Sequence, residues 1–487
     1  MGYFRKTACA AVMVALSSGV AWAQPDDSTV PGATTTSPST DLSGEWNGGG
    51  TGGKWKGPGA PGDFTFKAQG GSNYSIRFIA NAADYSIQTG EVTAKLSGTK
   101  LTITWVPTSG IVGTIGGSTA GAPKKVVYER SADADFDYLE LSSGTELPNG
   151  VKAPKQLRRL KPTQIDFPAE WELSDEILWG YKDTFAVSRI YRSALAGCAA
   201  NGEKVKHRFY VTTAHDKNQL SYEFGEDFGT GPEMDLVLWR SFKFGSVWMR
   251  DYGPWTVRKK SNGDRVIGDM GYFSDRPDDD RLPYDYATLR GWERLDLSAL
   301  KIEGGNIQSD GKGRLFTSTR TLEGKSWGAN DSQAAVEKNL RKVGATDVVF
   351  LERMPEPEGT GHNDMFSKLM NAKDALVGRH SDPRFKGTLD RNAKRFEALG
   401  YKVTRVDFAR PEKVTGVPKD GLPLMTYTNS LMVGKTCLVT AYKDLERDKA
   451  AAEIYKQLGW KPVMIDVRSI IGANGAIHCI SMQVPAK

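Results

Sequence analysis

Three segments in the second half of the chain share one pattern, and this repeat constrains the fold more than any other feature. Each has apolar residues at helical spacing, then a glycine, then a short β-branched run, and the glycines are Gly344, Gly400 and Gly459. Because glycine suits the left-handed turn that ends many helices, each segment predicts a helix, a glycine cap and a buried strand. The spacings of 56 and 59 residues indicate a repeat architecture, although a doubly wound sheet would show the same units. Either way, residues 163–487 are predicted to be α/β.

Residues 43–160 have a different sequence pattern. Short runs with alternating apolar residues, such as DFTFKAQ, YSIRFIAN and LTITWVP, are separated by Gly, Asn and Asp. Runs of this length between turn signals predict a small all-β sandwich or barrel. We expect an accessory domain that could bind a surface or a glycan, and its ligand stays open.

The first 42 residues have the pattern of an export signal followed by a linker. Arg5 and Lys6 precede an apolar run and then Ala21-Trp22-Ala23, which predicts a signal peptide over residues 1–23, cleaved near Ala23. Residues 24–42 are rich in Pro, Ser and Thr and predict a disordered linker. We therefore expect an exported protein, periplasmic or secreted, with no membrane span in the mature chain.

The net charge and the cysteines narrow the function classes. A net charge of +6 without a block of Lys or Arg does not indicate nucleic-acid binding. Cys9 falls within the predicted signal, so Cys198, Cys437 and Cys479 remain. An odd number of cysteines in an oxidising compartment leaves at least one thiol unpaired or joins two chains. Whether Cys198 and Cys437 form a disulfide is open at this stage.

Four glycine-containing stretches outside the repeats carry the polar and reactive residues. They are SVWMRDYGPWTV, KIEGGNIQSDGKG, GTGHNDMF and GANGAIHCISM, which hold Asp251, Glu303, His362 with Asp364, and Cys479. A thiolate is a strong nucleophile, and an imidazole can stabilise it and move protons. Two carboxylates suit a planar cation with several N–H donors, so the set fits attack on a guanidinium carbon. No cluster of ligands at metal spacing appears, and no cofactor is expected.

Taken singly, each of these residues has a plainer explanation. A histidine is more often a hydrogen-bonded structural residue than a catalyst, Asp251 could pair with Arg250, and turns such as EGGN are common. The combination of Cys, His and two Asp within this set of four loops is what favours one shared site.

Together the motifs WMRDYGPW, IEGGNIQSDGKG, GHNDMF and GAIHC resemble the agmatine deiminase and bacterial, Porphyromonas-type peptidylarginine deiminase family of the guanidino-group-modifying, or pentein, superfamily. The resemblance covers residues 163–487 and implies a five-bladed α/β propeller around a central site. It also implies that Cys479 is the nucleophile, His362 the general acid and base, and Asp251 and Asp364 the groups that hold the guanidinium.

The resemblance also implies further substrate contacts. Trp248 would pack on the alkyl part of the substrate, Asn429 would line the site, and Glu303 would support it or serve only the turn. Arg276 matches the first of two arginines that hold a substrate carboxylate in the peptidylarginine enzymes. Asp278 stands where the second would be, which puts a preference for C-terminal arginine in doubt.

The resulting expectation is a secreted deiminase that converts peptidyl-arginine to citrulline with release of ammonia through a covalent thiouronium. The alternative within the family is agmatine deiminase, which makes N-carbamoylputrescine for putrescine synthesis. Two other classes stay open: a cysteine protease, although the order of residues differs from papain-like enzymes, and an inactive propeller joined to a binding domain. The expected partner is a guanidine substrate, and the oligomeric state is open.

Overall fold

The structure, a computed structural model, describes a large part of the chain. The predicted signal peptide (1–23) and linker (24–42) lie outside the described residues. The described residues are 44–46, 64–70, 73–78, 92–97, 99–105, 124–132, 136–144, 155–160, 163–182, 186–224, 234–238, 245–323, 330–414 and 424–487.

Eight strands near the N-terminus form one antiparallel sheet in which each strand pairs with the next. The strands are β1 (Gly44–Trp46), β2 (Phe64–Gly70), β3 (Asn73–Phe78), β4 (Val92–Ser97), β5 (Lys100–Trp105), β6 (Lys124–Ala132), β7 (Phe136–Ser143) and β8 (Gln156–Leu160). The alternating runs therefore form strands, as expected. β1 and β8 contact each other without being paired, which brings the two edges of the sheet together. Whether this sheet works as a separate accessory domain stays a prediction.

The rest of the described chain contains five smaller sheets of three or four strands. Four of them repeat one order: a first strand pairs antiparallel with a second, and a helix leads from the second to a parallel third strand. These units are β13 (Trp255–Lys259), β14 (Arg265–Gly271), α4 (Pro277–Arg290) and β15 (Glu293–Lys301); β16 (Gln308–Ser309), β17 (Arg314–Ser318), α6 (Gln333–Lys342) and β18 (Asp347–Leu351); β19 (Ser367–Leu369), β20 (Asp374–Arg379), α7 (Pro383–Ala398) and β21 (Lys402–Asp407); and β22 (Leu431–Val433), β23 (Thr436–Ala441), α8 (Leu445–Gln457) and β24 (Lys461–Asp466).

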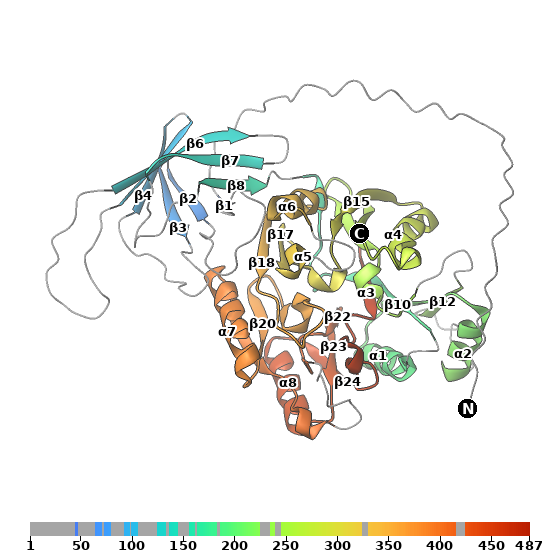
Figure 1. Cartoon of the computed structure of the whole chain (residues 1–487). Helices are drawn as coiled ribbons and strands as arrows, with labels where there is room; N and C mark the ends of the chain where they lie inside the picture. The colour runs from blue at the N-terminus through green and yellow to red at the C-terminus, as the bar shows by residue number, and fades with distance from the viewer. Residues whose placement is uncertain are drawn as a thin grey trace, which may run out of the picture.

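The fifth sheet is formed from the two ends of this region. Its first strand is the last of the chain, β25 (Ser481–Pro485), which pairs antiparallel with β10 (Ser174–Gly180). Helix α1 (Ser188–Ala200) then leads to the parallel strand β11 (Lys206–Val211). The remaining elements are β9 (Ile165–Asp166), at the edge of the β13 sheet, α2 (Ala214–Phe224), β12 (Met234–Leu238), α5 (Arg320–Glu323) and η4 (Pro411–Lys413). Figure 1 shows the helices of these units on the outside and the strands inside.

The helix–glycine–strand prediction is confirmed at all three sites. Gly344, Gly400 and Gly459 have φ values of 104°, 93° and 86°, the left-handed region that glycine adopts without steric cost. The same device ends α1 and α4, at Gly202 and Gly291, with φ values of 80° and 63°. These two units were missed because neither is followed by a run as rich in β-branched residues.

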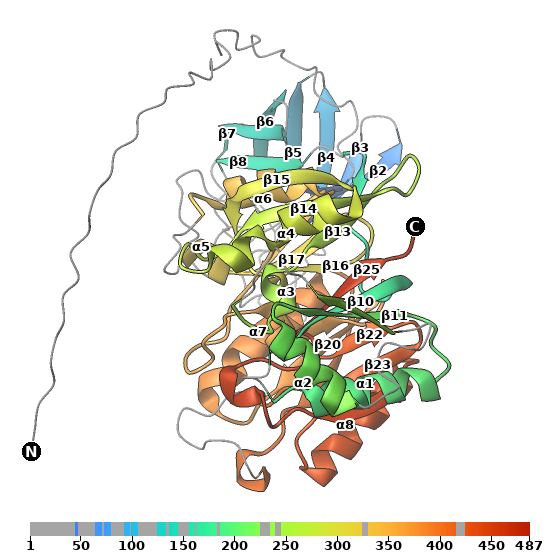
Figure 2. The ribbon, with the colours of Figure 1, turned by 90° about the vertical axis from the view of Figure 1, so that its right-hand side faces the viewer.

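The hydrophobic core spans several units. One cluster joins α1, α8 and their strands, and a second joins α4, α6 and their strands. The second cluster includes Phe136 from β7, which is 4% exposed, so the eight-stranded sheet packs on this part of the molecule. Figure 2 shows that sheet at one end, next to α6 and β15. In the described part of the chain, no helix has both the length and the apolar character needed to cross a membrane.

Candidate active site

The candidate residues occupy equivalent places in the five sheets, just before the first strand of each. Asp251 lies in α3 (Met249–Tyr252) before β13, and Glu303 precedes the turn η2 (Gly304–Asn306) before β16. His362 and Asp364 lie at and in the turn η3 (Asn363–Met365) before β19. Asn429 comes before β22, and Cys479 follows η5 (Ile471–Ala473) and precedes β25. Each unit therefore contributes one loop to the candidate site.

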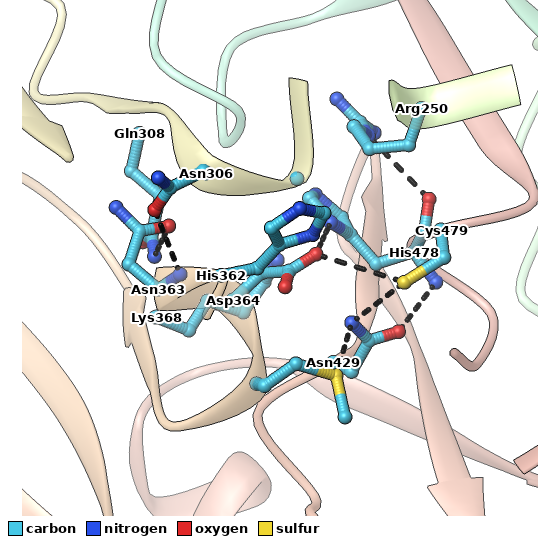
Figure 3. A network of polar contacts seen from close by, with 12 residues as sticks. Arg250, Asn306, Gln308, His362, Asn363, Asp364, Lys368, Asn429, His478 and Cys479 are labelled. Carbon is cyan, nitrogen blue, oxygen red and sulfur yellow. Dashed lines mark hydrogen bonds and ion pairs between the residues drawn. The ribbon is translucent and has the colours of Figure 1, made fainter. Parts of the chain in front are cut away.

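Cys479 is buried and has two polar neighbours. Cys479 is only 2% exposed, and the Nδ2 of Asn429 donates a hydrogen bond to its Sγ at 3.2 Å. The Oδ2 of Asp364 lies 3.9 Å from the same sulfur. Asn429 also accepts at Oδ1 from the backbone N–H of His478, at 3.1 Å, so one amide fixes the thiol and its loop (Figure 3).

The surroundings of Cys479 favour the neutral thiol when no substrate is bound. Burial raises the pKa of this thiol well above its ordinary value, and the negative charges of Asp364 and Asp251 raise it further. A cation between these carboxylates would act in the opposite direction, because it favours a negative sulfur nearby.

His362 is buried between two carboxylates. Its Nε2 lies 2.9 Å from the Oε2 of Glu303, and its Nδ1 lies 3.7 Å from the Oδ1 of Asp251. Glu303 thus contacts the predicted acid and base, and it sets the orientation of the ring. This contact goes beyond a role confined to the turn.

The two predicted guanidinium ligands face a space that a glycine leaves open. A Cβ added to Gly305 would lie 2.6 Å from the Nδ1 of His362, 2.8 Å from the Oδ1 of Asp251 and 3.2 Å from the Oδ2 of Asp364. The backbone N–H of Gly305 donates to Asp251 Oδ1 at 3.3 Å. The Oδ1 of Asp364 is buried and has no hydrogen-bond partner among the described residues. An unsatisfied buried carboxylate oxygen is costly, and a ligand with N–H donors would satisfy it.

Trp248 lies against the loop that carries the thiol. A Cβ on Gly475 would be 2.5 Å from the indole of Trp248, so the ring packs directly on that backbone. The indole is half-buried and contacts both large core clusters. This position is compatible with the predicted packing on a substrate chain.

Arg276 and Asp278 lie at the start of α4 and are exposed. The guanidinium of Arg276 lies 5.1 Å from the ring of Phe273. Within the described ranges, no hydrogen bond or ion pair joins either residue to Cys479 or His362. Their neighbour Asp279 accepts a hydrogen bond from the N–H of Gly245, which places this helix start near the Trp248 loop. Their role in substrate recognition stays a prediction.

Two residues of the site were missed by sequence reasoning. His478, directly before the predicted nucleophile, contacts Asp364 through Nδ1 at 2.7 Å and Glu170 through Nε2 at 3.1 Å. Glu170 belongs to the segment before β10, far from the motifs in sequence, and no local pattern marks it. The GAIHC motif contains His478, but the sequence analysis assigned a role only to Cys479 in this motif.

The three described cysteines, Cys198, Cys437 and Cys479, are all free and buried, so Cys198 and Cys437 do not pair. No group of three or more His, Cys, Asp or Glu side chains in the described ranges is arranged to hold a metal ion.

Known proteins resemble the part of the chain that carries this site. The sequence profile of the Porphyromonas-type peptidyl-arginine deiminase family matches residues 166–485. An agmatine deiminase of Stutzerimonas stutzeri is 25% identical over 363 residues, which are 66% of this chain and 95% of that protein. An agmatine deiminase of Ectopseudomonas mendocina is 26% identical over 275 residues, or 49% of this chain and 74% of that protein. Among solved structures, an agmatine deiminase of Enterococcus faecalis has a TM-score of 0.56 at 17% identity, covering 66% of this chain and 96% of the other.

Proposed function

The chain belongs to the Porphyromonas-type peptidyl-arginine deiminase family, whose members are hydrolases acting on C–N bonds, and we propose that it deiminates the arginine guanidinium of peptides or proteins. One observation carries the proposal. The Cys479 sulfur lies 3.9 Å from the Asp364 carboxylate, whose other oxygen is buried and has no partner in the described part of the chain. The predicted nucleophile therefore lies beside a carboxylate oxygen that a cation with several N–H donors would satisfy.

Binding would place the guanidinium between Asp251 and Asp364. A carboxylate accepts two parallel N–H bonds from this planar cation, and the pair holds it more firmly than it would a simple ammonium group. The space beside Gly305 keeps the two carboxylates and His362 within reach of one small ligand. Trp248 would cover the alkyl chain that leads to the guanidinium.

The chemistry would then proceed in two steps. Cys479 first passes its thiol proton to His362, and its sulfur bonds to the central guanidinium carbon. One C–N bond then breaks, and the leaving nitrogen takes that proton from His362 and departs as ammonia. A covalent thiouronium remains. His362 next takes a proton from water, the water oxygen bonds to the carbon, and the C–S bond breaks to give the ureido product and the thiolate.

The cationic substrate would itself activate the nucleophile. Burial, Asp364 and Asp251 hold the pKa of Cys479 well above its ordinary value. A bound guanidinium offsets the charges of both carboxylates, so the negative sulfur becomes more favourable as the substrate arrives. The reactive thiolate would then exist mainly in the complex.

The substrate class has two candidates. Predicted export favours peptidyl-arginine, because a secreted enzyme meets peptides and proteins, and the family profile points the same way. Agmatine is the alternative, supported by relatives that are agmatine deiminases and by the acidic Asp278 next to Arg276. Agmatine would give N-carbamoylputrescine, the precursor of putrescine.

Three further proposals complete this function. The repeated strand order supports a five-bladed pentein propeller with the site at its centre. The pattern of residues 1–23 supports export. The eight-stranded sheet would be an accessory domain that binds a surface or a glycan, the role that would dominate if the site were inactive.

Ammonia release tests the proposal and separates the candidates. The full chain is incubated with agmatine, free arginine, and peptides with internal or C-terminal arginine, with Cys479→Ser as the control. We expect turnover of an arginine peptide and a loss of at least about 10³-fold in Cys479→Ser. Turnover of agmatine alone would establish the alternative. No ammonia from any guanidine, or cleavage of peptide bonds instead, would refute deiminase function.

A further inference from the structure

His478 is the least explained residue of the site. Its ring is 2% exposed and lies between two carboxylates, with Nδ1 at 2.7 Å from Asp364 Oδ2 and Nε2 at 3.1 Å from Glu170 Oε2. His478 lies in the loop that carries the thiol and directly precedes Cys479. Its backbone N–H donates to Asn429. Figure 3 shows its contact with the same carboxylate that faces the sulfur.

The geometry favours hydrogen on both nitrogens of this ring, because each faces a carboxylate oxygen. Carboxylate oxygens only accept hydrogen bonds, so each contact is a hydrogen bond only if the nitrogen donates. A neutral imidazole has one donor, and its second nitrogen would then face a carboxylate with like partial charge. The doubly protonated, cationic form satisfies both contacts. The other charged groups nearby are Arg250, whose Nε lies 3.4 Å from the His478 carbonyl oxygen, and Asp251 across the site.

Glu170 is itself firmly held behind the ring. Its carboxylate accepts from the Nζ of Lys368 at 2.7 and 2.8 Å and from the backbone N–H of Met432 at 3.0 Å. Burial alone would raise the pKa of Glu170, but Lys368 and His478 hold it well below its ordinary value. The far side of the imidazole therefore rests on a charged and fixed anchor.

We propose that His478 is a positioning residue, a cationic ring that holds the Asp364 carboxylate on a Glu170 anchor so that its second oxygen faces the guanidinium. This inference rests on the proposed deiminase function for its kinetic consequences. The ring has a second effect: its positive charge partly offsets Asp364, which would otherwise act in full on the sulfur 3.9 Å away. His478 thus fixes both the geometry and the charge of the substrate cradle.

Two substitutions separate the two contacts of the ring. Asn places an amide nitrogen near the position of Nδ1, and Gln places one near the position of Nε2. We expect His478→Asn to keep the bond to Asp364 and stay within about tenfold of the wild type in kcat/KM. His478→Gln keeps only the Glu170 side and should lose about 10²-fold, since a misplacement of about 1 Å in a catalytic group has this cost.

Chemical rescue gives a readout that a merely structural role would not produce. A cavity lined by Glu170, Arg250 and Trp255 is also lined by His478, and Cys479 is not among its lining residues. In His478→Ala, imidazole can enter from this cavity and bridge the two carboxylates again. We expect added imidazole to restore at least tenfold of the lost kcat/KM, with saturation.

Alkylation of Cys479 tests the charge effect without any substrate. The full chain reacts with iodoacetamide over a pH range, and mass spectrometry reports modification at Cys479. Burial raises the pKa of Cys198, with Glu203 adding to it, and of Cys437 to about 12. Because mass spectrometry assigns each modification to its own cysteine, any reaction at these two does not enter the midpoint of Cys479. We expect the alkylation midpoint of His478→Ala to lie about one pH unit above that of the wild type.

His207→Gln is the matched control. His207 is also 2% exposed, but it accepts from the indole N–H of Trp179 in the core and contacts none of the site residues described here. It should change thermal stability and leave kcat/KM and the alkylation midpoint unchanged. The positioning role is wrong if His478→Asn and His478→Gln lose activity equally, imidazole rescues nothing and the midpoint stays in place. If the wild type deiminates no guanidine, the proposed function fails, while the alkylation shift still decides the role of His478.

Discussion

At the scale of single residues, the shape of the candidate site depends on a glycine, Gly305, which has no side chain. Gly305 lies where His362, Asp251 and Asp364 converge, and any Cβ there would approach all three within 3.2 Å. Three polar groups can converge on one small ligand only because this position has no side chain. The glycine is therefore part of the cradle, although it carries no reactive group.

Gly305→Ala should impair catalysis more than folding. The methyl group would lie 2.6 Å from the Nδ1 of His362 and 2.8 Å from the Oδ1 of Asp251, so both polar groups must move. We expect kcat/KM to fall about 10²-fold, because such displacements disturb the reacting geometry. Steady-state ammonia release measures the effect.

A second glycine substitution controls for this experiment. Gly387 lies inside α7, and its added Cβ would meet only the flexible end of Arg391, at 3.1 Å. Gly387→Ala should leave kcat/KM unchanged and raise stability by roughly 0.5–1 kcal/mol. Equal kinetics of the two variants would show that the space beside Gly305 is not needed.

The sequence predicts the reactive members of the site better than their support. Cys479, His362, Asp251 and Asp364 could be grouped because each stands in a short glycine-containing loop whose chemistry suits a guanidinium. Glu170 could not be found in this way, because its partners Lys368 and His478 are distant in sequence and the contact exists only after folding. A buried ion pair leaves no local pattern.

At the scale of elements, the helix–glycine–strand unit explains the sequence repeat and how well each unit tolerates replacement of its glycine. The left-handed glycine ends the helix and turns the chain into the parallel strand, which a residue with a Cβ would do under strain. An added Cβ would meet no atom within 4 Å in four of the five units, whereas at Gly344 it would meet the backbone of Ile165. That difference is not visible in the sequence, and it predicts different costs for the same substitution.

Gly344→Ala and Gly400→Ala form a matched pair. Gly400 has φ 93° and no atom within 4 Å of an added Cβ. Gly400→Ala should therefore lower the free energy of unfolding only by the backbone strain that it introduces, about 1–2 kcal/mol. At Gly344, with φ 104°, the Cβ would also lie 2.6 Å from the backbone oxygen of Ile165. We expect Gly344→Ala to cost at least about 1 kcal/mol more in urea unfolding. Equal costs would mean that β9 moves away freely.

Helix α4 contains a buried carboxylate whose charge opposes folding. Asp279 is 0% exposed, and burial raises its pKa to about 6 despite its hydrogen bond from Gly245. The folded state therefore binds a proton more tightly than the unfolded chain, whose Asp has a pKa near 3.8. The resulting stabilisation is present below about pH 4 and is lost as the pH rises through about 6.

Asp279→Asn should remove this dependence on pH. Relative to the wild type, the variant should lose up to about 3 kcal/mol of unfolding free energy between pH 7 and pH 4, since it no longer gains from protonation. Urea unfolding at several pH values measures this difference. The exposed neighbour Asp278 provides the control, because Asp278→Asn should follow the wild type throughout. A constant difference between Asp279→Asn and the wild type would contradict the raised pKa.

At the scale of the whole molecule, the eight-stranded sheet shares core packing with three of the smaller sheets, those of β10, β13 and β17. Phe136 of β7 belongs to the same apolar cluster as residues of α4, α6 and β25, and Tyr138 packs beside it with ring centroids 5.7 Å apart. The sequence pattern predicts an all-β segment followed by an α/β segment, and the described strands and helices agree with the α/β class of the second. It could not predict this joint, because contacts between regions depend on their relative placement.

Phe136→Ala tests whether the joint couples the two regions. Removal of a buried phenyl ring should cost roughly 3–5 kcal/mol, because it leaves a cavity in a cluster that both regions share. We expect the loss of deiminase activity on heating and the loss of near-UV circular dichroism to shift together to lower temperature, with kcat/KM at 25 °C unchanged. Tyr222→Ala, which truncates an aromatic ring that is 83% exposed, should shift neither. If heat inactivation stays in place while only part of the spectroscopic transition moves, the catalytic region is stable without the sheet, and the shared cluster does not couple them.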